Sequence, residues 1–395
     1  MEFKEYTVED LVSNNMLDKP LDGNHGNKHP KSSDYTSDGV PFIMVSDIEN
    51  GKINYNTCKF ISTEQRNTLD KGFSKPGDVL LSHKATIGLT CMVDSKYPEI
   101  VITPQLTYYR VKNGIDNYYL KYYFDSPFFQ NILKNWATSG STRAYLGITA
   151  QLKLPILLPD INVQKKIAKV LKTIDQKIEL NNQTNNNLYK TFRSIYKNTF
   201  LNKTTNTIKF SDFNEIGSLV MGQSPKGSSY NEEKIGLPLI NGAADYKDGM
   251  LNPNKYTSEP TRVCNAKDLV FCIRATIGQL TIADQEYCLG RGVACISNIN
   301  ELYYEYVFNI IEESIDKLKA VATGSVILGL SKDDINNLEV YKPTLEEIEK
   351  FHIIEQPILN RIIEIKKQNK TLEQIRDTLL PKLMNGEIDL DKIEI

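Results

Sequence analysis

An internal repeat is the feature that most constrains what this 395-residue chain can fold into. Residues 83–88 read His-Lys-Ala-Thr-Ile-Gly, and residues 273–278 read Ile-Arg-Ala-Thr-Ile-Gly. Each block follows an apolar segment led by an aspartate, Asp78 in the first copy and Asp268 in the second. Further matches follow in the same order: 39–43 with 236–240, 138–141 with 322–325, 146–149 with 328–331, and Pro159 with Pro343. Matches that keep one order predict a duplicated domain, because the loops between them are free to differ in length.

Each copy is predicted to be a mixed α/β domain followed by a helix. β-Branched and aromatic residues predict strands at 77–81, 101–102, 106–109, 267–271 and 293–296. Apolar residues at roughly helical spacing predict a helix over 117–136 in the first copy and over 301–322 in the second. The expected fold is of the α+β class, with two pseudo-symmetric domains separated by two long helices. The expected boundaries are 1–157 and 204–342 for the domains, and 158–203 and 343–389 for the helices.

The two helical segments carry the pattern of a coiled coil. Residues 161–200 contain no glycine or proline, and their apolar residues recur at alternating spacings of three and four around a polar centre. The predicted seam positions are Ile167, Leu171, Ile174, Ile178, Asn185 and Leu188 in the first helix, and Ile354, Ile358, Ile365, Asn369, Leu372 and Ile375 in the second. We expect an antiparallel pair within the chain; the alternative is that each helix packs only on its own domain.

The second helix has a recognisable start and one irregular position. Thr344 and Glu347 are spaced as a capping box directly after Pro343. Pro357 has no counterpart in the first helix, where Thr173 stands at the equivalent position. We therefore expect either a kink at Pro357 or a short leading helix separated from the long one.

Composition limits the class of protein without naming its ligand. The net charge of −2 argues weakly against nucleic acid, but phosphate contact needs only a local basic surface. The first residues show no basic stretch leading into an apolar run, and no apolar segment is long enough to span a bilayer. We therefore expect a cytoplasmic protein without a membrane partner. The six cysteines form no Cys-x-x-Cys pair, so reduced thiols are expected rather than a zinc site.

Sequence motifs for catalysis are missing. No Gly-x-x-x-x-Gly-Lys-[Ser/Thr] loop is present, so no ATP site of that type is supported. Residues 252–255 read Asn-Pro-Asn-Lys and lack the aromatic residue on which a base-flipping methyltransferase stacks its base. The four histidines form no convincing set of metal ligands. We therefore expect a non-catalytic protein, with no cofactor and no metal, whose partners carry out the chemistry.

The closing segment resembles a known family. Residues 376–388 read Arg-Asp-Thr-Leu-Leu-Pro-Lys-Leu-Met-Asn-Gly-Glu-Ile, which is very similar to the distal conserved region of type I restriction–modification specificity subunits. Residues 164–178 resemble the head of their central conserved region. Residues 22–26 and 222–225 resemble the openings of two classes of target-recognition domain. The resemblance covers nearly the whole chain, although residues 189–197 lack the closing motif of the second helix.

The resemblance implies that the two globular copies are target-recognition domains and that the helices dock partner proteins. The implied function is sequence-specific recognition of a split double-stranded DNA target, which directs methylation and restriction by other subunits. The implied partners are two copies of an adenine-methylating modification subunit and ATP-driven restriction and translocation subunits. Two alternatives stay open: the recognition subunit of a related fused nuclease–methylase system, and a coiled-coil scaffold without DNA specificity.

DNA contact is expected in the loops of both domains. Each repeated block places a cation and a hydroxyl after a strand, which suits phosphates or base edges, although a β-turn with a surface cation explains it equally well. Its last residue, Gly88 or Gly278, would allow close approach to the backbone. Lysines of the opening loops are also explained by solvated surface. The candidates are Lys28, Lys84, Thr86, Ser139, Ser141, Thr142, Arg143 and Tyr145 in the first domain, and Ser224, Lys226, Tyr230, Arg274, Thr276, Arg291, Thr323 and Ser325 in the second.

Overall fold

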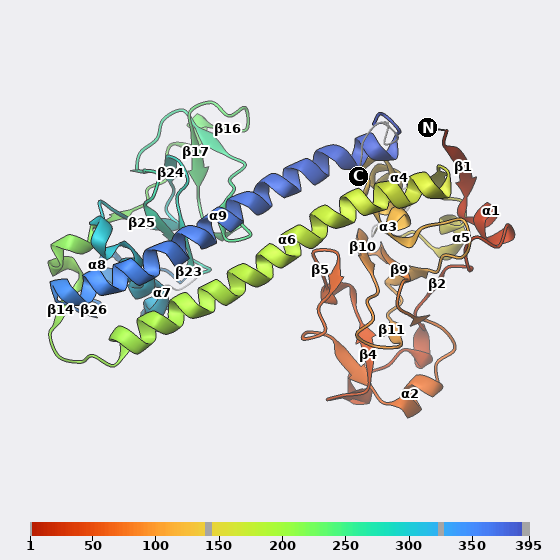
Figure 1. The fold of residues 1–395 in the computed structure, drawn as a ribbon, viewed down its shortest axis with the longest axis horizontal. Coiled ribbons are helices and arrows are strands. Elements are labelled where there is room, and N and C mark those ends of the chain that lie inside the picture. The colour runs from red at the N-terminus through yellow and green to blue at the C-terminus, as the bar shows by residue number, and fades with distance from the viewer. Residues whose placement is uncertain (1, 139–143, 323–327, 389–395) are drawn as a thin grey trace. The chain divides into compact units, whose positions relative to one another are not determined.

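The computed structural model describes residues 2–138, 144–322 and 328–388 of the chain. By their contacts the residues divide into two compact units, unit 1 (Met1–Glu179 with Lys370–Ile395) and unit 2 (Leu180–Asn369). Each unit holds one copy of the repeat and one stretch of each long helix, so the units are described separately (Figure 1). Within the described ranges, no helix is long and apolar enough to cross a membrane.

Unit 1 is built on two sheets that share a buried cluster of side chains. The four-stranded sheet runs in the order β10 (Thr86–Met92), β9 (Val79–Lys84), β12 (Leu106–Tyr109) and β2 (Leu21–Asp22). The five-stranded sheet runs in the order β3 (Tyr35–Thr36), β7 (Lys59–Ile61), β4 (Val40–Ile43), β11 (Ile100–Ile102) and β8 (Phe73–Ser74). Two further pairs are β1 (Lys4–Thr7) with β13 (Pro155–Leu158), and β5 (Ile48–Glu49) with β6 (Lys52–Ile53). Strands β4 and β11 are parallel, and their neighbours are antiparallel.

The helices of unit 1 differ from the prediction at one point. α3 (Asn117–Asp125) and α4 (Pro127–Thr138) both contact β10, and the shorter helices are α1 (Val8–Ser13), α2 (Thr63–Asn67) and α5 (Ile148–Gln151). The single helix expected over 117–136 is therefore wrong. Ser126 is extended, with ψ of 142°, and Pro127 opens the second helix. The residue before a proline disfavours the helical conformation, which is why the chain breaks there.

Unit 2 repeats the sheet topology of unit 1. Its four-stranded sheet runs in the order β23 (Gly278–Ile282), β22 (Leu269–Cys272), β25 (Val293–Ser297) and β15 (Ser218–Met221). Its five-stranded sheet runs in the order β16 (Tyr230–Asn231), β20 (Tyr256–Thr257), β17 (Leu237–Ile240), β24 (Tyr287–Leu289) and β21 (Val263–Cys264). Two further pairs are β14 (Thr207–Lys209) with β26 (Glu339–Tyr341), and β18 (Tyr246–Lys247) with β19 (Met250–Leu251). Because β17 and β24 are again the parallel pair, the predicted duplication holds at the level of strand order and direction.

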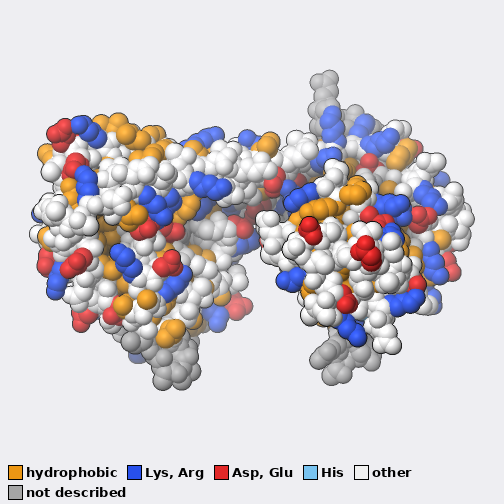
Figure 2. All heavy atoms as spheres, turned by 90° about the horizontal axis from the view of Figure 1, so that it is seen from below, with side chains coloured by type: hydrophobic (Ala, Val, Ile, Leu, Met, Phe, Trp, Pro, Cys, Tyr) orange, Lys and Arg blue, Asp and Glu red, His pale blue; other side chains and the backbone are white. Residues whose placement is uncertain are grey.

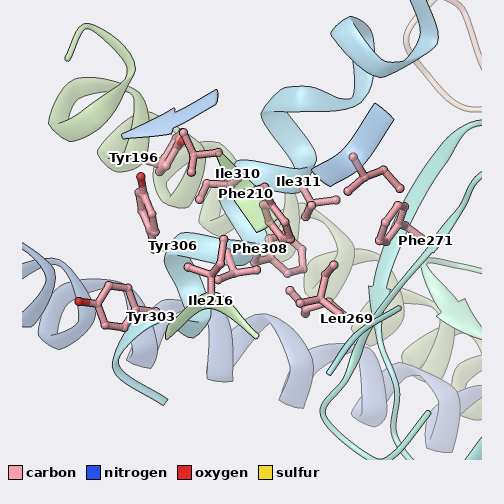
Figure 3. Packing of buried hydrophobic residues seen from close by; sticks show 14 of the residues in the cluster. Tyr196, Phe210, Ile216, Leu269, Phe271, Tyr303, Tyr306, Phe308, Ile310 and Ile311 are labelled. Carbon is pink, nitrogen blue, oxygen red and sulfur yellow. The ribbon is translucent and has the colours of Figure 1, made fainter. Parts of the chain in front are cut away.

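A buried aromatic cluster forms the main core of unit 2. Helix α7 (Tyr304–Val321) lies against the strands, and α8 (Lys332–Asn336) follows it. Figure 3 shows Tyr306, Phe308 and Phe271 packed among aliphatic side chains from the strands and from α7. Phe200 stacks edge-to-face on Tyr306, with ring centroids 5.0 Å apart. Burial of this many large apolar side chains supplies most of the free energy that holds the unit together.

Two long helices pass through both units. α6 (Ile161–Tyr196) continues into a π-helical turn (Lys197–Leu201), and α9 spans Leu345–Met384. The predicted capping box is present, since the Glu347 carboxylate accepts the Thr344 N–H at 2.8 Å and the Thr344 hydroxyl accepts the Glu347 N–H at 3.3 Å. α9 is continuous through Pro357, so the expected separate leading helix is wrong. A helix loses one hydrogen bond at a proline, and the packing of its neighbouring turns evidently offsets that loss.

Within unit 2 the two helices pair in antiparallel fashion around a polar centre. Asn181 Nδ2 donates to Asn369 Oδ1 at 2.7 Å, and Asn185 Nδ2 donates to the Ile362 carbonyl at 3.4 Å. Partner numbers fall along α9 as they rise along α6, which is the antiparallel direction. Both Asn181 and Asn369 are buried, so the pair fixes the register of the two helices.

Not all side chains at the predicted coiled-coil seam are buried. Ten predicted seam positions lie at least partly inside. Ile167, Leu171, Ile365 and Asn369 are buried, and Ile174, Ile178, Asn185, Leu188, Ile358 and Leu372 are half-buried. Ile354 and Ile375 are 52% and 42% exposed, so their placement in the seam is wrong. The stripe drifts around a straight helix when it is extended at strict heptad spacing, because 3.6 residues per turn do not match a repeat of 3.5.

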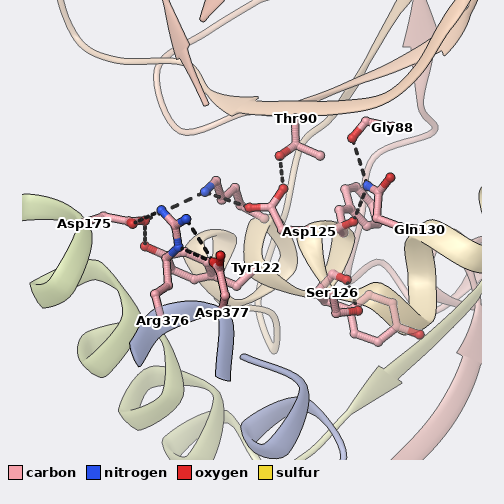
Figure 4. Close-up of polar contacts among 12 residues, drawn as sticks. Gly88, Thr90, Tyr122, Asp125, Ser126, Gln130, Asp175, Arg376 and Asp377 are labelled. Carbon is pink, nitrogen blue, oxygen red and sulfur yellow. Dashed lines mark hydrogen bonds and ion pairs between the residues drawn. The ribbon is translucent and has the colours of Figure 1, made fainter. Parts of the chain in front are cut away.

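In unit 1 a chain of polar contacts joins the sheet to both long helices (Figure 4). The Thr90 hydroxyl of β10 donates to Asp125 of α3, and Lys121 bridges Asp125 at 2.8 Å and Asp175 of α6 at 3.9 Å. Arg376, from the closing motif on α9, donates to Asp175 at 3.1 Å. The closing motif therefore completes the fold of unit 1, although it lies more than 200 residues away along the chain.

Candidate nucleic-acid interface

The repeated blocks form the tips of two equivalent hairpins. Strands β9 and β10 are joined at Ala85, and β22 is followed by the same turn at Ala275. Both alanines have positive φ angles, 64° and 57° respectively, a conformation that is strained for a residue with a Cβ. At each tip the cation and hydroxyl are exposed: Lys84 and Thr86 in unit 1, Arg274 and Thr276 in unit 2. The two hairpins thus present the same pair of functional groups on the same strained turn.

A loop from much later in the sequence is hydrogen-bonded along each hairpin. In unit 1, Ala85 N donates to Ala144 O at 3.2 Å, and Leu146 N donates to His83 O at 2.9 Å. In unit 2, Ala275 N donates to Leu328 O at 3.0 Å, and Leu330 N donates to Ile273 O at 2.9 Å. Residues 144–146 are therefore equivalent to 328–330.

This register corrects the alignment of 146–149 with 328–331. The Leu-Gly pairs in the two copies look alike, but they are two positions out of step in the structure. Leu146 matches Leu330, and Gly147 and Ser331 occupy the same place as the N-caps of α5 and α8. The equivalence of the two loops is set by their hydrogen bonds to the hairpins and not by sequence similarity within a short loop.

The corrected register gives the two hairpin cations unlike neighbours. Tyr145 forms an antiparallel β-bridge with Lys84, and its side chain is 48% exposed. The centroid of the Tyr145 ring lies 5.9 Å from Lys84 Nζ. Gly329 pairs with Arg274 in the same way. A Cβ at Gly329 would lie 3.2 Å from Arg274 Cγ, so the arginine stem lies over the glycine. An aromatic ring therefore supports the cation in unit 1, and bare backbone supports it in unit 2.

A third loop contacts each hairpin. It connects β11 to β12 in unit 1 and β24 to β25 in unit 2. His83 N donates to Gln105 O at 3.0 Å, and Ile273 N donates to Gly292 O at 2.9 Å. The loop 103–105 is thus equivalent to 290–292. Arg291, a predicted candidate, is exposed on this loop. Gln105 was missed by sequence reasoning, although a polar residue between two apolar strands and directly after Pro104 was a usable signal.

The opening loops complete the cluster. A Cβ at Gly23 would lie 2.0 Å from Ile102 O, and a Cβ at Gly222 would lie 2.1 Å from Gly290 O, so both positions require glycine. The two openings identified by resemblance are thus equivalent in structure. In unit 2 the Ser224 hydroxyl lies 3.3 Å from Arg291 Nε, so two of the predicted DNA-contact residues are neighbours in the structure.

Other predicted residues lie elsewhere or are engaged. Lys28 is exposed and paired with Asp70. Tyr230 lies in edge strand β16, opposite Thr257. Lys226 is exposed and caps the short turn Gly227–Ser229 that precedes this strand. Six candidates lie outside the described residues: Ser139, Ser141, Thr142, Arg143, Thr323 and Ser325.

The glycines of the repeated blocks are explained by packing within each unit, without any contact to DNA. Gly88 has a φ of 90°, and a Cβ there would lie 2.2 Å from Gln130 Oε1. Gly278 has a φ of 110°, and a Cβ there would lie 3.2 Å from Ile315 Cγ2. Each glycine lets its hairpin pack on a helix, α4 in unit 1 and α7 in unit 2.

Below the tip, the hairpin of unit 1 is more polar than that of unit 2. His83 is buried, and its Nδ1 lies 2.7 Å from the Thr107 hydroxyl, whereas Ile273 stands at the equivalent place. Burial lowers the pKa of His83 to about 4, so the ring is neutral at pH 7. Nearby, burial alone would raise the pKa of Asp22, but hydrogen bonds from Lys71 and His25 hold it below its usual value. His83 therefore adds no charge, and the exposed Lys84 provides the cation at this tip.

The charge pattern of the surface is mixed. Figure 2 shows lysine and arginine side chains interspersed with aspartate and glutamate over the face drawn. This face is therefore not uniformly basic. Within residues 2–138, 144–322 and 328–388, no group of three histidine, cysteine or acidic side chains is arranged to hold a metal ion.

Comparison with known proteins assigns both copies of the repeat to the same family. The family model for the type I restriction modification DNA specificity domain matches twice, at residues 16–190 and 202–376. A Methanocaldococcus jannaschii protein described as the MjaX specificity subunit of a type I restriction enzyme is 28% identical over 377 residues, covering 89% of this chain and 87% of that protein. The MjaIX specificity subunit of the same organism is 24% identical over 396 residues, covering 92% and 90%.

One solved structure has a similar fold along nearly the whole chain. The crystal structure of the type I restriction–modification system S subunit from M. genitalium covers 97% of this chain and 96% of its own, with a TM-score of 0.59. Sequence identity is 15%, so this likeness concerns the fold alone. It agrees with the expected α+β class, two repeated domains and paired long helices.

Proposed function

This chain belongs to the type I restriction modification DNA specificity domain family, the family of type I specificity subunits, and we propose that it reads a split double-stranded DNA target with one loop cluster in each unit. Each cluster combines the hairpin tip, the loop that pairs with it, the loop before β12 or β25, and the opening loop. The two half-targets differ in sequence, because the two clusters differ in side chains.

One observation carries this proposal. Equivalent hydrogen bonds hold the hairpin tip and its two neighbouring loops in both units, and the opening loops match through Gly23 and Gly222. The side chains at equivalent places are nevertheless unlike: Lys84 and Arg274, Tyr145 and Gly329, Gln105 and Gly292. Exposed cations and hydroxyls suit contact with phosphates and base edges. A framework that stays constant while its exposed side chains vary is the arrangement expected of two readers with different specificities.

Catalysis in this proposal belongs to partner subunits. The relatives are described as specificity subunits of restriction enzymes, so we assign methylation to modification subunits and cleavage to restriction subunits that bind this chain in the cytoplasm. Partner binding is supported by apolar side chains on the outer face of α9, where Ile353 is 71% exposed and Ile354 is 52% exposed.

Exchange of one recognition domain tests the proposal most directly. When residues 1–157 are replaced by the matching domain of another specificity subunit, we expect one half of the methylated sequence to change and the other half to persist. The readout is methylome sequencing of cells that carry the native gene, the hybrid gene or neither. An unchanged methylation pattern in the hybrid, or methyl transfer by the isolated native chain, would contradict the proposal.

Removal of a hairpin cation tests the proposed surface. We expect Lys84→Ala and Arg274→Ala each to weaken binding of double-stranded DNA and to reduce the salt dependence of the binding constant by about one charge. Lys96→Ala, which removes a lysine of unit 1 outside the loop cluster, is the matched control and should leave both quantities unchanged. Equal effects from all three substitutions would indicate non-specific attraction and would count against the assigned surface.

A further inference from the structure

A hollow of about 450 Å³ opens beside the hairpin tip of unit 1. Its polar lining comes from Ser46, Lys84, Thr86 and Gln105, and its apolar lining includes Val45 and Leu89. Gln105 is half-buried, and its side-chain amide has no hydrogen-bond partner among the described residues. The main chain of Gln105, by contrast, is held by the 3.0 Å bond from His83 N. Gln105 therefore lines this hollow from a fixed main chain, with the donor and acceptor of its amide both available.

The chemistry of this hollow matches an adenine–thymine pair. A glutamine amide can donate to adenine N7 and accept from its N6 amino group at the same time. The methyl group of thymine requires an apolar wall, which Val45 and Leu89 provide. Lys84 and Thr86 at the rim suit the phosphates that flank the pair.

The equivalent loop of unit 2 offers a different group. Gly292 stands at the place of Gln105, and a Cβ there would lie 1.9 Å from Asn241 O, so no side chain can occupy that place. A Cβ at Gly290 would lie 2.3 Å from Asn241 Oδ1, so a side chain there would have to displace the Asn241 amide. Arg291 is therefore the residue of this loop that can reach outward, and Ser224 lies 3.3 Å from its Nε. A guanidinium is the group that pairs in bidentate fashion with O6 and N7 of guanine.

We propose that Gln105 reads an adenine in one half-target and that Arg291 reads a guanine in the other. The proposal rests on the proposed function and adds the identity of one base for each unit. Both residues lie on equivalent loops, and Arg291 stands one position before the equivalent of Gln105.

Selection from a random double-stranded DNA library by the full chain tests this assignment. Gln105→Ala should relax preference at one adenine of the first half-target by about tenfold to a hundredfold and leave the second half intact. Arg291→Ala should do the same at one guanine of the second half-target. Gln105→Glu is the sharper variant, because a carboxylate accepts from the N4 amino group of cytosine, so the preferred base should shift from adenine to cytosine.

The outcomes separate this inference from the proposed function. If the native chain selects no sequence, and directs no methylation with its modification subunit, the proposed function fails. If the native chain selects a split sequence but Gln105→Ala and Arg291→Ala select the same one, the proposed function stands and this inference is overturned. Relaxation at both half-targets by either variant would also overturn it. Unchanged circular dichroism and melting of each variant exclude loss of folding as the cause.

Discussion

Replacement of Asp78 by alanine is expected to destabilise unit 1 by about 3 to 5 kcal/mol, the largest loss we predict for a single side chain of the repeat. Asp78 is 2% exposed and lies at the start of β9. Its two carboxylate oxygens accept from Arg110 Nε at 2.8 Å and Arg110 Nη2 at 2.7 Å. The Ser74 hydroxyl and the Lys75 N–H donate to the same carboxylate, at 2.9 and 2.8 Å. Alanine would leave a partly buried guanidinium without its counterion and two donors without an acceptor.

The repeat supplies a matched control for this substitution. Asp268 occupies the same place in unit 2, but Ser297 stands where Arg110 stands in unit 1. Asp268 accepts from the Ser297 hydroxyl at 2.5 Å and from the Asn265 N–H at 2.8 Å. Asp268→Ala breaks hydrogen bonds, and no ion pair with another described residue, so we expect a smaller loss of about 1 to 3 kcal/mol.

Hydrogen exchange followed by mass spectrometry is the suitable measurement, because two units in one chain need not unfold in a single transition. Asp78→Ala should speed amide exchange in β9 and β12, and Asp268→Ala should speed it in β22 and β25. Asp78→Asn keeps the shape but not the charge, and it should fall between native and Asp78→Ala. Equal losses at Asp78 and Asp268 would show that the ion pair with Arg110 contributes nothing.

The same aspartates show what the sequence could predict. Their place before an apolar segment led to a strand start, and β9 and β22 confirm it. The duplication, the strands and the capping box of α9 could be predicted because each depends on residues that are close together in the chain. The break at Pro127 could have been predicted for the same reason, since the rule for the residue before proline is local.

The loop register could not be predicted. Tyr145 and Gly329 become equivalent only through hydrogen bonds to hairpins that lie about 60 residues earlier in the chain. The Leu-Gly pair in each copy pointed to a different alignment because nothing local fixes a loop of variable length. Gln105 could not be predicted as a site residue for a related reason. It lines a hollow together with Lys84 and Val45, which are distant from it in the sequence.

Replacement of Glu355 by glutamine is expected to stabilise unit 2 above neutral pH by about 3 to 5 kcal/mol. Glu355 lies on α9, is 0% exposed, and has no hydrogen-bond partner for either carboxyl oxygen among the described residues. Burial, and then the charge of Glu305 on α7, raises the pKa of Glu355 to about 8, while Asn309 and Arg193 oppose that rise. His352 on the same helix is occupied with Glu305 at 2.7 Å.

The direction of the pH dependence follows from that pKa. A carboxyl group with a raised pKa in the folded state is held protonated there, so its contribution to stability is full below the unfolded pKa of about 4.5. That contribution is lost as the pH rises toward 8, where the buried group must ionise. Glutamine copies the neutral form and does not ionise. The gain from Glu355→Gln should therefore be below about 1 kcal/mol at pH 5 and largest at pH 8 to 9.

Thermal or urea unfolding across this pH range, with exchange in α7 and α9 as the local readout, measures the effect. Glu349→Gln removes an exposed carboxylate from the same helix, and it should change stability by less than about 0.5 kcal/mol at every pH. A gain from Glu355→Gln that does not grow between pH 5 and pH 8 would mean that Glu355 is not held neutral in the native chain. In that case Arg193, which also donates to Asn309 Oδ1 at 2.8 Å, would have to balance an ionised Glu355. Arg193→Gln should then be destabilising with Glu355 present and much less so with Gln at 355.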